Sequence, residues 1–271
     1  MPYAVEERDV AYTKVAGAEL LARVYRPTGG GTDALPALID VHGGAWNAND
    51  RTTGVLHCRA LAAGGLVIAS LDFRQGPAHQ HPAASEDVAA GVRWLRAHAR
   101  ELGIDARRLG IVGSSSGGQL ALLHALTSTG DAAVAYVLAL YPVADPLARY
   151  RYALGREHEP PPPSGFNAKR LIASSRAYFA DEAAMAEASV TRIAASGAAK
   201  ARPPAFVAQP ELDDNVPAEI TEAFVRAYRS AGGTVEHARF PGMRHGFMTA
   251  AGPAHDECVA MMRDFIGKQL R

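Results

Sequence analysis

One serine of this chain has the surroundings of a nucleophile. Residues 113–117 read Gly-Ser-Ser-Ser-Gly, and among these serines only Ser115 has a glycine two positions before it and another two positions after it. The apolar run 109–112 precedes this segment and a helix-like run follows it, which predicts a sharp turn between a strand and a helix. Such a turn exposes the serine hydroxyl above the sheet, where it can attack a carbonyl carbon.

A serine hydroxyl attacks well only when a base removes its proton, and His245 is the candidate base. It follows an expected strand at 234–240 and precedes Gly246, so the backbone there can turn the imidazole towards the sheet. Its expected role is to accept the proton of Ser115 and then to return it to the leaving group.

The imidazole in turn needs a carboxylate on its far nitrogen. Asp213 and Asp214 follow the short apolar strand at 206–208, and only one of two adjacent carboxylates can point at the ring. We assign this role to Asp213, with Asp214 as the alternative and Glu211 as a more distant one.

A second glycine-rich turn predicts an oxyanion hole. The buried strand at 38–41 leads into His-Gly-Gly-Ala-Trp at 42–46, and glycine lets the main chain approach a substrate carbonyl. We expect the backbone N–H groups of Gly43, Gly44 and Ser116 to bind the charged oxygen. The side chains expected to contact the substrate are those of Trp46, Ser114, Val216 and Phe247.

The elements that must position these residues alternate along the chain. A polar and apolar alternation over 8–26 predicts an antiparallel hairpin with its turn at Gly17, followed by a loop at Gly29–Gly31. Strands and helices then alternate, which predicts a doubly wound, mostly parallel sheet with helices on both faces. The expected strands are 36–41, 66–71, 108–112, 134–140, 206–208 and 234–240, and the expected helices are 53–63, 84–101, the segment after Ser115, 218–231 and 253–269.

The alternation stops between residues 145 and 201. This stretch holds four prolines at 160–163 and a weakly helical segment with Tyr178, Phe179 and Met185, and it has no strand pattern. An insertion between two strands of an open α/β sheet is expected to lie over the edge where ligands bind. We therefore expect a single domain over 1–271 with 145–201 as an inserted lid or cap.

Composition limits the partners. The formal net charge is zero and there is no long run of like charge, which gives no support to nucleic-acid or membrane binding. His79 and His81 have no third ligand at a suitable spacing, and no phosphate-binding or dinucleotide motif occurs, so we expect neither metal nor cofactor. Residues 1–7 lack a secretory pattern, and Cys58 and Cys258 are expected to be buried, inert thiols in a cytoplasmic protein. The oligomeric state is left open, with a homodimer as one option.

The motifs together resemble the hormone-sensitive-lipase-like esterases of the α/β-hydrolase superfamily. The resemblance covers about residues 19–268 and includes 72–84, which is similar to the Y-R-L-A-P-E-H-x-F-P-A-A segment of that family. It implies an α/β-hydrolase fold and ester hydrolysis with Ser115, Asp213 and His245 as the triad. The chain departs from the common G-D-S-A-G-G motif at Ser114 and Ser116 and leaves little room for a helical N-terminal cap. The shortened form with H-G-G-x-W also looks like arylformamidases and bacterial feruloyl-esterase-like hydrolases.

The leading hypothesis is thus a carboxylesterase that cleaves small soluble esters through an acyl-enzyme. The alternatives are an aryl-formamide hydrolase with the same triad and a non-catalytic ligand-binding protein on a hydrolase scaffold. A complete set of serine, acid and histidine argues against the last alternative.

Overall fold

The described residues form a single eight-stranded sheet. The computed structural model describes residues 2–29, 34–160, 162 and 164–271. The strands stand in the order β1-β2-β4-β3-β5-β6-β7-β8; the pairs β1–β2 and β2–β4 are antiparallel and the remaining pairs are parallel. Their bounds are Ala4–Val15 (β1), Ala18–Thr28 (β2), Leu35–Val41 (β3), Val67–Leu71 (β4), Ile104–Ser114 (β5), Val137–Leu140 (β6), Ala205–Pro210 (β7) and Val235–Phe240 (β8).

The predicted hairpin and parallel sheet are both present. β1 and β2 pair through a turn at Ala16–Gly17, at the glycine that the sequence indicated. In β3, Ile39 and Val41 belong to one apolar cluster and Leu38 to the other, because neighbouring side chains of a strand point to opposite faces. Each face of the sheet therefore needs its own cover of helices. Of the Gly29–Gly31 loop, residues 30 and 31 lie outside the described part of the chain.

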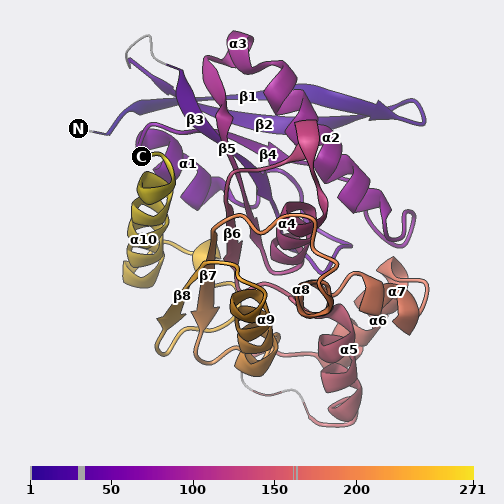
Figure 1. Ribbon diagram of the computed structural model, residues 1–271. Coiled ribbons are helices and arrows are strands. Elements are labelled where there is room, and N and C mark those ends of the chain that lie inside the picture. Colours follow the sequence, from indigo (N-terminus) through magenta and orange to yellow (C-terminus); the bar gives the residue numbers. More distant parts are fainter. Residues whose placement is uncertain (1, 30–33, 161, 163) are drawn as a thin grey trace.

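Helices cover both faces (Figure 1). α1 and α10 pack on one side, and α2, α4 and α9 contribute to the apolar cluster on the other. The helix bounds are Val55–Ala63 (α1), Ala83–Ala97 (α2), Ala99–Leu102 (α3), Ser116–Thr127 (α4), Ala218–Ser230 (α9) and Pro253–Gln269 (α10), with short 3-10 turns at Gly130–Ala132 and Phe247–Thr249. No helix within the described ranges has both the length and the apolar composition needed to cross a bilayer.

The segment 145–201 is more regular than its sequence suggested. It forms the four helices Pro146–Gly155 (α5), Ala168–Tyr178 (α6), Glu182–Glu187 (α7) and Val190–Ser196 (α8). Each begins where a side-chain oxygen accepts a backbone N–H of the first turn, and these capping residues are Asp145, Asn167, Asp181 and Ser189. The expectation of one weak helical segment was therefore too coarse. Of the proline run, Pro161 and Pro163 lie outside the described residues.

Candidate active site

Ser115 lies in the turn between β5 and α4, with φ 54° and ψ −119°. Its N–H donates to the carbonyl oxygen of Leu140 at 2.8 Å, which ties the turn to the end of β6. The next helix passes close to the sheet, since a Cβ on Gly117 would lie 2.0 Å from the carbonyl oxygen of Val41. Only glycine allows this approach, and the turn it permits raises the serine above the strand ends.

A chain of two hydrogen bonds joins the three predicted catalytic side chains. Ser115 Oγ lies 2.8 Å from His245 Nε2, and His245 Nδ1 lies 2.8 Å from Asp213 Oδ2. A carboxylate can only accept, so Nδ1 carries the proton and Nε2 is free to accept the serine proton. The other Asp213 oxygen, Oδ1, accepts the backbone N–H groups of Asn215 and Val216 at 3.0 and 2.8 Å, which holds the carboxylate in place.

The neighbouring acid points elsewhere. Asp214 Oδ2 accepts a hydrogen bond from Ser164 Oγ and lies 3.9 Å from Arg244 Nη1. Glu211 Oε2 accepts the backbone N–H of Gly242. Of the three acids that the sequence offered, the structure therefore brings Asp213 to the imidazole.

The loop after β3 lies against the nucleophile. A Cβ on Gly43 would lie 3.1 Å from Ser115 Cβ and 3.0 Å from the Ser114 carbonyl oxygen, so glycine lets the backbone approach there. His42 is buried, its ring stacks on Phe73, and its Nδ1 lies 2.8 Å from the Gly43 carbonyl oxygen. Burial lowers the pKa of His42, so the ring is neutral at pH 7 and supports the loop without adding charge.

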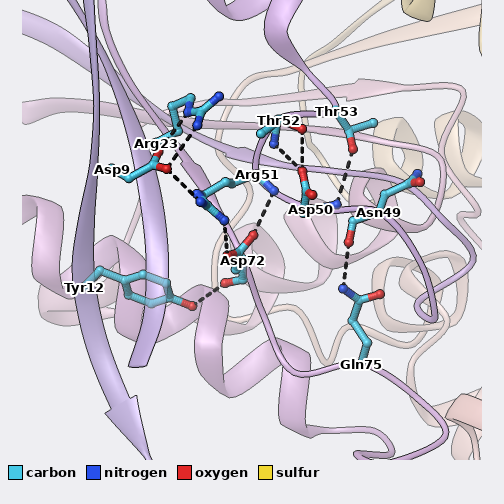
Figure 2. A network of polar contacts seen from close by, with 10 residues as sticks. All are labelled: Asp9, Tyr12, Arg23, Asn49, Asp50, Arg51, Thr52, Thr53, Asp72 and Gln75. Atoms are coloured by element: carbon cyan, nitrogen blue, oxygen red, sulfur yellow. Dashed lines mark hydrogen bonds and ion pairs between the residues drawn. The ribbon is translucent and has the colours of Figure 1, made fainter. Parts of the chain in front are cut away.

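A polar network fastens the same loop to the N-terminal hairpin (Figure 2). Arg51 donates to Asp9 of β1 at 2.7 Å and to Asp72, just after β4, at 2.8 Å. The hydroxyl of Tyr12 donates to the Asp72 carbonyl oxygen at 2.7 Å, and Arg23 donates to Asp9. Three segments that are distant in the sequence are thereby joined beside the predicted oxyanion loop.

Two amide side chains, those of Gln75 and Asn49, connect this part of the protein to Gly43. Gln75 Nε2 donates to the Asn49 carbonyl oxygen at 2.9 Å, as Figure 2 shows, and Asn49 Nδ2 donates to the Gly43 carbonyl oxygen at 3.1 Å. The orientation of the Gly43 peptide is therefore fixed from two sides, by His42 and by Asn49. A fixed peptide dipole is what an oxyanion site requires.

A cavity of about 550 Å³ opens over Ser115. Ser114, Ser115, Gly43, Gly44 and His245 belong to its wall, and α5 and α6 of the inserted segment complete it. Its described polar lining also includes Asn47, Asn49, Thr53, Arg149, Asn167, Arg170, Ser174, Asn215 and Thr249.

Three side chains expected to touch substrate lie behind this wall instead. Trp46 is 1% exposed, because its Nε1 donates to Gln119 Oε1 at 3.0 Å and its ring stacks on Tyr178. Val216 is fully buried, and Phe247 packs edge-on against Tyr141 and beside Phe240. None of the three is among the described residues that line the cavity.

The two serines beside Ser115 differ in position, and the predicted role of Ser116 depends on its backbone N–H rather than on its hydroxyl. Ser114 lies on the cavity wall, as expected. Ser116 is buried, and its hydroxyl accepts the backbone N–H of Trp46 at 3.2 Å, which ties the start of α4 to the oxyanion loop.

Sequence reasoning missed Arg149, Tyr141 and the asparagines of the wall. Tyr141 follows β6, and its ring lies 4.9 Å from that of His245. Arg149 shares a helical face with the buried residues Pro146, Tyr150 and Ala153. That spacing of three and four residues was the one signal in the sequence that it points inwards.

Possible metal ligands meet at one place in the described chain, away from the cavity. Asp40, His57 and Cys58 are all buried and bring one ligand atom each within 4.8 Å of the others. Asp40 already accepts hydrogen bonds from His57 Nε2 at 2.9 Å and from Ser70 Oγ at 2.6 Å. The carboxylate is thus satisfied by protein groups. His79 is exposed, and the ring of His81 packs near Phe179.

Comparison with known proteins agrees with this geometry. A family model described as alpha/beta hydrolase fold matches residues 38–249. Carboxylesterase NlhH of Mycobacterium tuberculosis is 33% identical over 141 residues, which are 51% of this chain and 43% of that protein. The chain thus spans less than half the length of that relative. An ethyl acetate hydrolase of Pseudomonas putida is 30% identical over 252 residues, covering 89% of this chain and 75% of that protein.

A solved structure has a similar fold. The thermostable carboxylesterase EstE1, cloned from a metagenomic library, superposes with a TM-score of 0.82 at 25% identity, over 100% of this chain and 92% of that one. The fold, the match along most of the chain and these relatives together identify the protein: it belongs to the alpha/beta hydrolase fold family.

Proposed function

We propose that the protein is a carboxylic ester hydrolase that cleaves small soluble esters through an acyl-enzyme on Ser115. The observation that carries this proposal is the hydrogen-bonded chain from Ser115 through His245 to Asp213 at the wall of the cavity. The relatives are named as esterases and ester hydrolases, which favours esters over aryl formamides.

The geometry suggests how the reaction proceeds. His245 Nε2 takes the Ser115 proton as Oγ bonds to the substrate carbonyl carbon, and Asp213 stabilises the imidazolium that forms. The backbone N–H groups of Gly43, Gly44 and Ser116 hold the negative oxygen. His245 then protonates the alcohol as it leaves, and it later activates the water that releases the acid and frees Ser115.

The inserted segment 145–201 acts in this proposal as a lid. Its helix α6 supplies Arg170, Leu171 and Ser174 to the cavity, so the substrate would be enclosed between this segment and the strand ends. We also place the protein in the cytoplasm, because Cys58 and Cys258 are both free and buried.

A serine-directed organophosphonate tests the nucleophile. We expect one adduct, on Ser115 by peptide mass spectrometry, and a loss of hydrolysis of p-nitrophenyl acetate by about 10⁴-fold or more in Ser115→Ala, because triad residues act as a unit. Ser230→Ala, at the exposed end of α9, is the matched control. An adduct on Ser114, or activity of Ser115→Ala within tenfold of wild type, would contradict the proposal.

A further inference from the structure

One buried charge in the cavity wall has no full set of partners. Arg149 on α5 is 1% exposed, and its Nη1 donates to Asn215 Oδ1 at 3.2 Å. Its Nε and Nη2 have no hydrogen-bond partner within the described part of the chain. The guanidinium carbon lies 5.1 Å from the centre of the Trp46 ring, so the aromatic face holds the group in position.

Among the described residues, no acid forms an ion pair or a hydrogen bond with this guanidinium, although the charge of Asp213 lies close enough to favour the charged form of Arg149. Asp213 uses one oxygen for His245 and the other for two backbone N–H groups. Asp214 accepts a hydrogen bond from Ser164. By contrast, Arg151, two positions along the same helix, is exposed and pairs with Glu182 at 2.7 Å.

A buried cation that has no hydrogen-bonded anion is costly, so an anion that enters the cavity and pairs with Arg149 would be stabilised. Burial lowers the pKa of Arg149 to about 10, so the group is still charged at neutral pH. The described cavity wall has no aspartate or glutamate, whereas Arg170 adds a second cation and the side-chain amide of Asn167 adds a neutral donor. The cavity is therefore suited to a negatively charged group.

We propose that Arg149 binds a carboxylate on the substrate, so that the preferred esters carry one free carboxylate beside the scissile bond. Two N–H donors of a guanidinium can hold the two oxygens of a carboxylate side by side, and Nε and Nη2 are such a pair. This inference rests on the proposed ester hydrolysis. The carboxylate stands in the acyl part or in the alcohol part of the ester, and the same contact recognises both.

Two matched substrate pairs test this on the wild-type protein. Monoethyl succinate and ethyl succinamate place a carboxylate or an amide in the acyl part, and 4-acetoxybenzoate and 4-acetoxybenzamide do so in the alcohol part. We expect kcat/KM at pH 7 to favour the carboxylate at least about tenfold in one pair, the effect of a hydrogen bond to a charged group. An amide that is cleaved as well as or better than the carboxylate in both pairs would overturn the inference.

Variants of Arg149 distinguish binding of a substrate carboxylate from structural support of the Asn215 loop. In Arg149→Met the ratio of kcat/KM for the carboxylate ester to kcat/KM for the amide should fall towards one, mainly through a higher KM for the carboxylate ester. Arg149→Lys should keep part of this ratio, because lysine retains the charge but not the paired donors. Arg151→Met, on the exposed side of α5, should keep the wild-type ratio. If Arg149→Met also keeps that ratio, Arg149 only supports the loop of Asn215 and the inference is wrong. If Arg149→Met does not fold, the wild-type pairs and Arg149→Lys decide.

The failure of this inference is distinct from the failure of the proposed function. If the protein hydrolyses p-nitrophenyl acetate but prefers the carboxylate in neither substrate pair, the proposed carboxylate site is wrong and the proposed ester hydrolysis stands. Failure to hydrolyse every ester overturns both.

Discussion

At the scale of single residues, the site depends on one strained serine and one buried carboxylate. The φ of 54° at Ser115 lies in a region that costs a non-glycine residue about 1–3 kcal/mol. Local hydrogen bonds offset this cost. The Ser115 N–H donates to the Leu140 carbonyl oxygen, and the Ser115 carbonyl oxygen accepts the backbone N–H groups of Gln119 and Val143. Ser115, the proposed nucleophile, is therefore held in this conformation at the cavity wall before any substrate arrives.

The two adjacent acids should differ sharply in catalysis. Asp213→Asn should lower kcat by about 10⁴, as in a well-studied triad, because an amide at this place favours the wrong tautomer of His245. Asp214→Asn should stay close to wild type, because its side chain faces Ser164 and Arg244. Steady-state kinetics on p-nitrophenyl acetate measure both, and circular dichroism checks the fold. Equal, mild losses in the two variants would exclude Asp213 as the partner of the imidazole.

At the scale of elements, the loop after β3, which holds the proposed oxyanion glycines Gly43 and Gly44, is held by the hairpin β1–β2 as well as by the sheet. Arg51 is the link, since it bonds to Asp9 on the hairpin and to Asp72 after β4. Hydrogen bonds from Arg23 and Arg51 hold the pKa of Asp9 well below its usual range. A depressed pKa means that the folded protein binds the charged form better, so the stabilisation exists above the unfolded pKa of about 3.9 and is lost as the pH falls through the folded pKa.

Asp9→Asn should accordingly lower Tm at pH 7 by about 2–4 °C, the shift for a loss of about 1 kcal/mol in a protein of this size. The difference in Tm between Asp9→Asn and the wild type should decrease as the pH falls below about 4. Thermal unfolding at pH 7, 5 and 3 measures it, with Glu19→Gln on the same hairpin as the control. A gap that is constant over this range would mean that the charge of Asp9 does not act through this network.

The sequence predicted the order of these elements but not all of their limits. Alternating patterns and the glycine turns predicted the sheet and the position of Ser115, because both depend on local spacing. The helix expected over 84–101 instead ends at Ala97 and restarts at Ala99, where the His98 side chain bonds back to the Trp94 carbonyl oxygen. That interruption covers a single residue, which the residue pattern of an amphipathic helix does not indicate.

The contacts of the cavity were harder to predict, because they join distant segments. Trp46 follows the oxyanion glycines directly, yet its indole is turned under the loop by Gln119, which lies 73 positions away. For Arg149 the sequence offers only its spacing from Pro146, Tyr150 and Ala153, which does not say what the side chain contacts. Only the packing of α5 against Trp46 and Asn215 brings it to the substrate side.

At the scale of the whole molecule, the surface and the cavity both suit substrates dissolved in water. The exposed large apolar side chains of the described residues are Tyr3, Leu212 and Met261, which lie far apart in the sequence. An enzyme that acts on lipid droplets needs a broad apolar face to bind them. The wall of the cavity mixes apolar side chains such as Phe166 and Leu171 with many polar ones, and a long alkyl chain would leave those polar groups without partners.

Activity should therefore fall with acyl length. We expect kcat/KM to be highest for p-nitrophenyl acetate or butyrate and to drop for octanoate and palmitate. Each buried methylene adds at most about 0.8 kcal/mol until the wall is reached, and overpacking then costs binding. A maximum at octanoate or beyond, or a jump in rate above the micellar concentration, would contradict the small-substrate proposal.

The two cysteines have a practical consequence for following the lid in solution. Cys58 and Cys258 are fully buried, and burial raises the pKa of Cys258 to about 12 and that of Cys58 well above its usual value. Only the thiolate reacts with maleimide dyes, and these thiols are neither ionised nor exposed to solvent. We therefore expect the native protein not to react with such dyes. A cysteine introduced on the exposed face of α6 would then be the single labelled position, and its fluorescence would report any movement of the proposed lid in otherwise unmodified protein.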